Sequence, residues 1–201
     1  EGLAERGHRV VLLYSPTRAE APFLERMRGL PVTTVRVPME RSVGAADLAA
    51  FRAVHRAVYN YGPFDVLHAH SSKAGALLRA VPTDAVNIYT PHAFKTMDPG
   101  SGLVAKLVYG GLEFALGAVA SDRIIAVSAA EEAHAISELR IPARKVVKVV
   151  NGVTAPKLRP RAEVREELGV LPDELLVGFV GRLSWQKNPE LYLQAIAGAR
   201  R

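Results

Sequence analysis

The sequence predicts an α/β fold in which helices cover a doubly wound parallel sheet. Short apolar runs without polar alternation, such as 10–14 and 175–180, are typical of parallel strands buried on both faces. Between such runs lie helical patterns, of which 45–59 has an apolar residue at every third or fourth position. Strands that alternate with helices favour one parallel sheet over an antiparallel sandwich.

The amino-acid composition limits the size of the fold, the chemistry of the site and the kinds of molecule that the protein can bind. The chain has 201 residues, 49% of them apolar, which suffices for one domain and part of another and excludes general disorder. It has no cysteine, which excludes disulfides, thiolate catalysis and cysteine zinc sites and fits a reducing cytoplasm. The net charge of +6 favours anionic partners such as sugar nucleotides or lipid phosphates. Nucleic acid is not expected, because the basic residues are scattered and no aromatic cluster accompanies them.

The first third of the chain should contain two strands and three helices. Gly7 has the position of a left-handed helix cap. The expected elements, in order, are a helix end at 1–7, a strand at 10–14, a helix at 21–28, a strand at 32–37 and a helix at 45–59. A helix end followed at once by a strand implies an earlier strand, so we expect the chain to begin inside the first helix of its domain.

The next two strands end in polar turns. His70, Ser71 and Ser72 follow a strand near 66–67 and precede a helix, so their side chains and the helix N–H groups suit an anion or a sugar hydroxyl. Ser71 as a simple helix N-cap is the alternative. A metal site on this turn is not expected, since no acidic third ligand lies near His70. His92 and Lys95 follow the strand 86–89. A packing or capping histidine and a solvated lysine are the alternatives there.

The segment 103–120 is apolar except for Lys106 and Glu113. Its charges and glycines argue against a membrane span. We expect a buried helix, with a helix lying in a membrane interface as the alternative.

The remaining elements lead to a basic loop. Ser128 and Glu131 form a capping-box pattern after a strand at 123–127, so Ser128 is a helix cap and not a nucleophile. The later elements, in order, are a strand at 146–150, a linker to 160, a helix at 161–168, a strand at 175–180 and a helix opened by Pro189. Gly181, Arg182 and Lys187 lie between the last strand and helix, where two cations and a helix N-terminus suit a diphosphate. A solvated basic loop is the alternative.

Four stretches carry a resemblance to a known family. They are 64–75 with its Asp-Val-Leu-His-Ala-His-Ser-Ser-Lys-Ala-Gly, 90–95 with its Thr-x-His, 122–128, and 178–190 with its Gly-Arg-Leu and Lys-Asn. Together with Asn-Gly-Val at 151–153 they resemble the retaining GT-B glycosyltransferases of family four, of the bacterial polysaccharide-assembly type. The resemblance covers nearly the whole chain.

The resemblance implies a domain plan. It implies an N-terminal, acceptor-side Rossmann-like domain at 1–152 that lacks its first strand, a linker at 153–160, and the beginning of a C-terminal nucleotide-sugar-binding domain at 161–201. The family's glutamate pair, which holds the donor sugar, finds no match in this sequence. We therefore expect the fragment to be inactive alone. We also expect the segment from 161 onward to pack poorly, because its apolar strand at 175–180 lacks sheet neighbours.

The resemblance also implies site residues. Arg182 and Lys187, with Gly181, match the family's donor-phosphate loop, and His92 matches the histidine close to the reacting sugar. His70, Ser71, Ser72 and Lys95 are further candidates for an acceptor or donor pocket. The resemblance implies no cofactor, because the nucleotide-sugar is a substrate. It implies no metal either, because basic residues would offset the charge of the leaving diphosphate.

The implied function is transfer of a hexose from a nucleotide-sugar to an acceptor, lipid-linked or saccharide, in polysaccharide or glycolipid synthesis. The implied location is the cytoplasm, with peripheral contact to the inner face of the membrane left open. Two alternatives remain: a GT-B nucleotide-sugar epimerase, which needs carboxylates as acid and base, and a non-catalytic module that binds a nucleotide or a partner protein.

Overall fold

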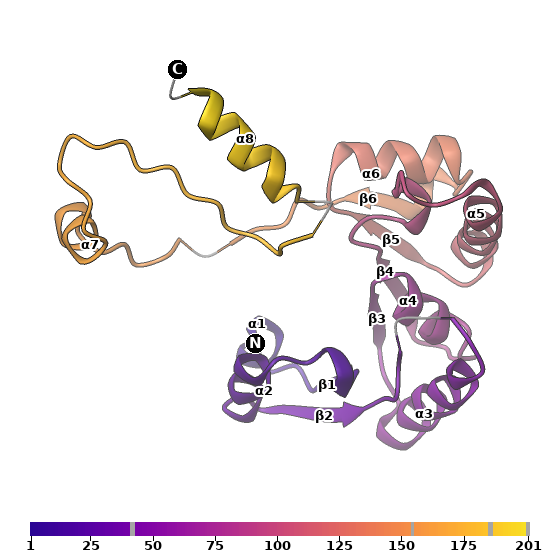
Figure 1. Ribbon diagram of the computed structural model, residues 1–201. Helices are drawn as coiled ribbons and strands as arrows, with labels where there is room; N and C mark the ends of the chain where they lie inside the picture. The colour runs from indigo at the N-terminus through magenta and orange to yellow at the C-terminus, as the bar shows by residue number, and fades with distance from the viewer. Residues whose placement is uncertain (41–42, 154, 185–186, 200–201) are drawn as a thin grey trace. The chain divides into compact units, whose positions relative to one another are not determined.

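The computed structural model describes residues 1–40, 43–153, 155–184 and 187–199. The chain divides into two compact units, Glu1–Gly152 and Val153–Arg201 (Figure 1). The strands are β1 Val10–Tyr14, β2 Val32–Arg36, β3 Val66–His70, β4 Val86–Thr90, β5 Arg123–Ala126 and β6 Val146–Lys148. The helices are α1 Gly2–Glu5, α2 Ala21–Arg28, α3 Ala46–Tyr61, α4 Ser72–Arg79, α5 Leu103–Val119, α6 Ala129–Ala133, α7 Arg161–Glu167 and α8 Pro189–Ala199.

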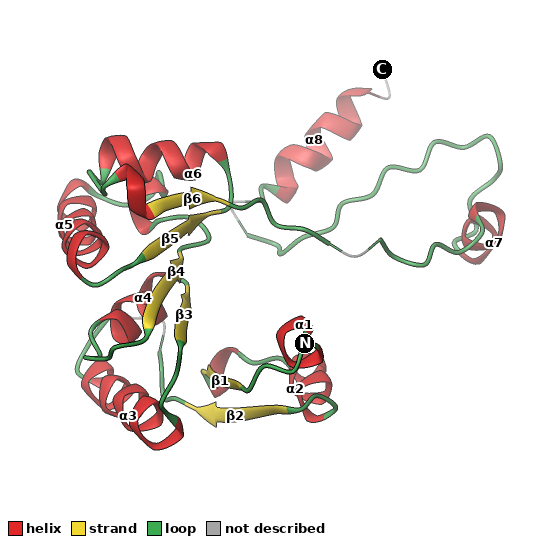
Figure 2. Cartoon of the chain, turned by 180° about the vertical axis from the view of Figure 1, so that it is seen from behind, coloured by secondary structure: helices red, strands yellow, loops and turns green. Residues whose placement is uncertain are grey.

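The α/β class and the parallel pairing are confirmed, but the described strands form two sheets and not one. β1 pairs with β2, and β3, β4, β5 and β6 pair in that order, all in parallel (Figure 2). Among the described residues, β1 pairs only with β2 and β3 pairs only with β4. Without a ladder of hydrogen bonds between β1 and β3, the two groups of strands remain separate sheets. Gly7, at φ +83°, has the left-handed conformation that its position as a helix cap predicts.

The four-stranded sheet contains the main core. Its buried side chains come from three strands and from the segments that follow β4 and α6: Ala69, Tyr89, Phe94, Ile124, Ala135, Leu139 and Ile141. Gly75 of α4 packs so closely on the ring of Tyr89 that a Cβ there would overlap it. This contact places the start of α4 directly against β4 and thereby sets the turn between β3 and α4.

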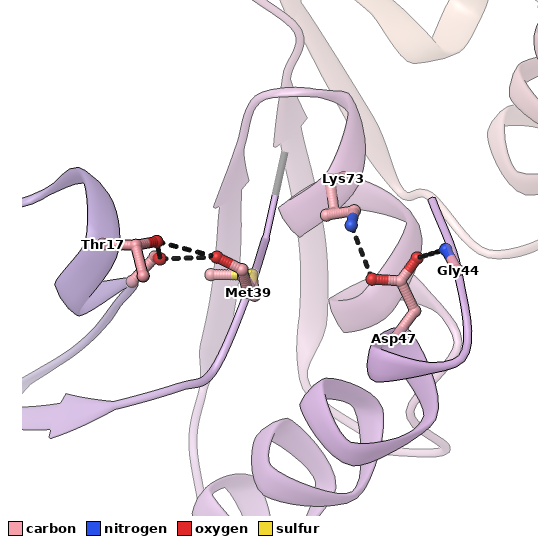
Figure 3. Close-up of polar contacts among 6 residues, drawn as sticks. Thr17, Met39, Gly44, Asp47 and Lys73 are labelled. Atoms are coloured by element: carbon pink, nitrogen blue, oxygen red, sulfur yellow. Dashed lines mark hydrogen bonds and ion pairs between the residues drawn. The ribbon is translucent and has the colours of Figure 1, made fainter. Parts of the chain in front are cut away.

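A second core joins α3 to the segments around it. Val37, Ala50, Val54 and Val81 are buried there. An ion pair also joins α3 to α4: Nζ of Lys73 in α4 lies 2.5 Å from Oδ1 of Asp47 in α3 (Figure 3). The other carboxylate oxygen of Asp47 accepts a hydrogen bond from the Gly44 N–H at 3.1 Å. The hydrogen bond with Lys73 is the main reason why the pKa of Asp47 is lowered. These contacts tie the N-termini of α3 and α4 together.

Helix α5 is not the buried helix that its composition predicts. Only Glu113 and Gly117 are buried along its length. Gly117 lies against Ile141 and Ile124, where a Cβ would come within 3.0 Å of Ile141. The helix therefore packs through its small residues, and its large apolar residues lie outside the contact. No helix in the described parts of the chain is long and apolar enough to cross a membrane.

The predicted strand at 175–180 is wrong. This segment belongs to no strand ladder, and Leu175 and Val180 are almost fully exposed. An extended segment becomes a strand only when neighbouring N–H and C=O groups pair with it, and the described residues of this unit offer none. The helices on either side are confirmed, as is the left-handed Gly169 at φ +66° that ends α7.

Candidate functional site

Three histidines gather at the carboxyl ends of β3 and β4. The Nδ1 of His70 lies 3.0 Å from the Nε2 of His92, and the Nε2 of His68 lies 2.8 Å from the Oγ1 of Thr90. The ring of His70 is 4.2 Å from that of His68 and 5.2 Å from that of His92, centroid to centroid. The two turns predicted to carry polar side chains therefore meet at one edge of the sheet, where parallel sheets commonly bind ligands.

Strand alternation explains why the first two histidines are together. Leu67 and Ala69 are buried, so His68 and His70 share the opposite face of β3. We predicted His70 in the turn, but the strand continues through it, because His70 pairs with Thr90 in the ladder. His92 lies just beyond β4 with an exposed ring.

The cluster favours neutral imidazoles. Loss of solvent, followed by the proximity of His70 and His92, lowers the pKa of His68 from 6.5 to about 4. Loss of solvent and the proximity of His92 also lower the pKa of His70. Each imidazole has two ring nitrogens, so the hydrogen bond between His70 and His92 leaves each ring one further nitrogen for a ligand. Such groups can bind sugar hydroxyls or move a proton.

The backbone around these rings is strained. Ser71, His92 and Ala93 have φ values of 75°, 52° and 76°, which non-glycine residues rarely adopt. Strain of this kind costs of order 1–3 kcal/mol at each residue and persists where the surroundings enforce it. The strained residues are concentrated at two adjacent turns, which makes these turns candidates for a functional role.

Glu131 enforces part of this geometry. Its buried carboxylate accepts from the Val127 N–H at 2.7 Å and from the N–H of Ala93. The predicted cap is confirmed, since Ser128 accepts from the Glu131 N–H at 3.1 Å. The capping pattern did not predict that the glutamate side chain reaches across to the turn of His92. The only signal in the sequence was its place three residues after Ser128.

The other predicted residues of the first unit have varied positions. Ser71 is the N-cap residue of α4, but its side chain makes no capping hydrogen bond, so capping does not account for it. Ser72 is the first residue of α4. Lys95 forms an exposed ion pair with Asp98 at 2.6 Å, which lowers the pKa of that carboxyl.

A buried polar network supports β4 beneath the histidines. The carboxylate of Glu113 accepts from the hydroxyl of Tyr89 at 2.9 Å and from the Nη2 of Arg79 at 2.8 Å. The guanidinium carbon of Arg79 lies 3.9 Å from the centre of the Tyr89 ring. Burial, with the nearby Glu113 charge, raises the pKa of Tyr89, so it remains a neutral donor. The network connects α4, β4 and α5.

The basic loop of the second unit ends in a helix cap. Asn188, at φ 46°, accepts from the Leu191 N–H through its Oδ1 at 3.1 Å and so opens α8. Arg182 and Lys187 are exposed. A Cβ at Gly181 would lie 3.7 Å from the Cγ of Lys187, an ordinary contact, so space does not demand a glycine there. Among the described residues, no group of three histidine, aspartate or glutamate side chains is arranged so that it could hold a metal ion.

Comparisons with known proteins agree on one family. The model of the glycosyl transferase 4-like domain matches residues 1–152. UDP-Gal:alpha-D-GlcNAc-diphosphoundecaprenol alpha-1,3-galactosyltransferase of Escherichia coli is 31% identical over 139 residues, covering 66% of this chain and 35% of that protein. D-inositol 3-phosphate glycosyltransferase of Geodermatophilus obscurus is 29% identical over 218 aligned residues, covering 97% and 47%.

The fold has a solved counterpart. A glycosyltransferase from Rickettsia africae matches with a TM-score of 0.61 at 16% identity, over 86% of this chain and 44% of that one. At this identity the likeness concerns the fold alone. The chain spans less than half the length of these relatives. Because the family model covers the whole first unit and most of the chain, this chain belongs to the glycosyl transferase 4-like domain family.

Proposed function

We propose that the protein is a glycosyltransferase that moves a hexose from a nucleotide-sugar to an acceptor, with retention of configuration at the sugar. The pairing of His70 with His92 at the carboxyl ends of β3 and β4 carries this proposal within the family. Two imidazoles joined by a hydrogen bond, one at the end of β3 and one on the strained turn after β4, are suited to orient sugar hydroxyls through their remaining ring nitrogens.

We assign binding of the donor diphosphate to the second unit. Arg182 and Lys187 stand before the N-terminus of α8, where cations and helix N–H groups favour a diphosphate. Basic groups there would stabilise the leaving nucleoside diphosphate as negative charge develops on it. His92 would hold the donor sugar, and His70, Ser71, Ser72 and Lys95 would line the acceptor or donor pocket.

The acceptor is proposed from the relatives' names. One relative acts on a sugar linked to diphosphoundecaprenol and others on D-inositol 3-phosphate, so a phosphorylated acceptor is common to both. We favour the lipid-linked acceptor, in polysaccharide or glycolipid synthesis at the cytoplasmic face of a membrane. A soluble phosphorylated acceptor is the alternative outcome of the test.

The test is a transfer assay with the longest reading frame that contains these residues. Radiolabelled nucleotide-hexoses with different bases are incubated with bacterial lipid extract or with inositol phosphate, and the products are separated by solvent extraction. We expect label in the lipid phase. Label in a soluble inositol product would show that the acceptor is a soluble phosphorylated compound and not a lipid-linked one. Label that stays in an isomerised nucleotide-sugar would favour the epimerase, and no turnover of any donor would contradict the proposal.

A further inference from the structure

Helix α5 has its polar and apolar sides reversed. Its two charged residues, Lys106 and Glu113, lie on the side that faces the protein, and Glu113 is buried. The exposed positions carry no charge or polar side chain at all: they are Leu103, Val104, Leu107, Val108, Gly111, Leu112, Phe114, Ala115 and Val119. A surface helix normally has the opposite arrangement, so this helix is built to meet an apolar environment.

The exposed residues form one continuous face. At ~100° per residue, they fill an arc of roughly 180° around the helix. Val104 lies near the middle of this arc and Val108 lies roughly 40° further round it, still within the arc, and the two are 75% and 64% exposed. The 17 residues of α5 extend over roughly 25 Å. Half of the helix circumference is therefore uncovered and apolar along its whole length.

A groove continues this surface on the protein side. It has a volume of about 960 Å³, and its apolar lining includes Met97, Phe114 and Leu139. Its charged lining consists of Lys106, Arg140 and Glu138, so cations outnumber carboxylates. His134 also lines it, and the Nε2 of His134 lies 2.7 Å from the Oγ1 of Thr96. A groove with an apolar lining and two cations suits an amphiphile with an anionic headgroup.

We propose that the exposed face of α5 and its groove dock the protein on the surface of an anionic lipid bilayer. The helix lies in the plane of the interface with its apolar half among the acyl chains, while Lys106 and Arg140 meet lipid phosphates. This inference rests on the proposed function insofar as a lipid-linked acceptor brings the enzyme to a membrane, and it identifies the surface that does so.

Charge favours an anionic bilayer over a second copy of the chain. The net charge of +6 opposes self-association and favours an anionic surface. Self-association therefore becomes an outcome of the test and not its premise.

The test is flotation of the purified chain with vesicles of phosphatidylglycerol or phosphatidylcholine, without any nucleotide-sugar. We expect binding to phosphatidylglycerol. Val104→Glu and Val108→Glu should each lower the partition coefficient by about tenfold, because burial of one aliphatic side chain contributes that much. Arg140→Gln should lower it by about fivefold on anionic vesicles only. Tyr59→Glu is the matched control, since Tyr59 of α3 is 83% exposed and lies outside the face.

A fluorescence measurement locates the contact independently. The chain has no cysteine, so Val108→Cys and Tyr59→Cys can each carry a single environment-sensitive dye. Only the dye at 108 should shift to the blue on addition of vesicles. Equal binding by the Val108→Glu and wild-type chains would overturn the inference, as would a wild-type dimer that Val108→Glu converts to a monomer without any vesicle binding. Neither result would bear on sugar transfer, which the assay of the proposed function measures separately.

Discussion

Two histidines of β3, His68 and His70, link stability to pH at the scale of single residues. The pKa of His68 falls from 6.5 in the unfolded chain to about 4 in the folded one, and the pKa of His70 is lowered too. Between these pH values the unfolded state binds more protons, so folding stability is fully present above about pH 6.5 and declines as the pH falls toward 4.

We therefore expect the free energy of unfolding, measured by urea denaturation, to decrease over that pH window. Both rings remain in contact with solvent, so the decrease is smaller than full burial would cause. His68→Asn should flatten the pH dependence, and His55→Asn, on the exposed side of α3, should leave it as in the wild type. An unchanged slope in His68→Asn would contradict the assignment.

Arg182 makes a second residue-scale prediction. If it holds the donor diphosphate, Arg182→Ala should weaken binding of nucleoside diphosphates by about 1.5–3 kcal/mol, as expected for a hydrogen bond to a charged group. Titration calorimetry on the longest reading frame measures this. Arg159→Ala is the control in the same unit, because Arg159 pairs with Glu163 and Glu167 instead. Equal affinities for the two variants would remove Arg182 from the site.

Part of the histidine cluster was predictable from the sequence. His70 and His92 follow apolar strands, and parallel strands bring their carboxyl ends to one edge. The contributions of His68 and Glu131 were not predictable. His68 joins the cluster only because β3 continues to His70, and Glu131 reaches Ala93, 38 residues away in the sequence. Contacts of that range depend on packing that local patterns do not encode.

At the scale of elements, two glycines in helices test the packing of α4 on β4. Gly75→Ala should destabilise the protein by about 1–3 kcal/mol, because its Cβ would overlap the ring of Tyr89. Gly111→Ala in α5 should stabilise it by up to about 1 kcal/mol, since nothing lies within 4 Å of an added Cβ and alanine favours a helix. Thermal or urea unfolding measures both, and equal effects of the two changes would refute the close contact.

The buried network under β4 gives another element-scale prediction. Glu113→Ala leaves the Arg79 guanidinium buried without its carboxylate and should cost about 3–5 kcal/mol. Glu132→Ala is the matched control, because the exposed pair of Glu132 with Lys148, 3.8 Å apart, contributes at most about 1 kcal/mol. A loss at Glu113 as small as that at Glu132 would show that the network does not hold the three elements together.

Element type was easier to predict than element environment. The helix at 103–120 and the strand at 123–127 appear nearly as expected, because periodicity and capping act locally. The burial of α5 was mispredicted, since apolar composition usually indicates a core helix and here only Glu113 and Gly117 are enclosed. The strand at 175–180 failed for the related reason that a strand requires partners, which composition does not supply.

At the scale of the whole molecule, the two compact units carry different parts of the proposed chemistry. The histidine cluster belongs to Glu1–Gly152 and the basic loop to Val153–Arg201. The α/β class was predictable because apolar runs typical of strands alternate along the sequence with the apolar periodicity of helices. The division of the described strands into two sheets was not, since it depends on which edges find partners.

The most direct test of this account measures hexose transfer from radiolabelled nucleotide-sugar to lipid acceptor by three forms of the longest reading frame: wild type, His92→Ala and His55→Ala. If the cluster at β3 and β4 is the centre of transfer, His92→Ala should lose about 10²-fold or more in kcat, the lower bound for a positioned acid–base or orienting group. His55→Ala should match the wild type. Near-normal turnover by His92→Ala, with intact folding, would contradict the account.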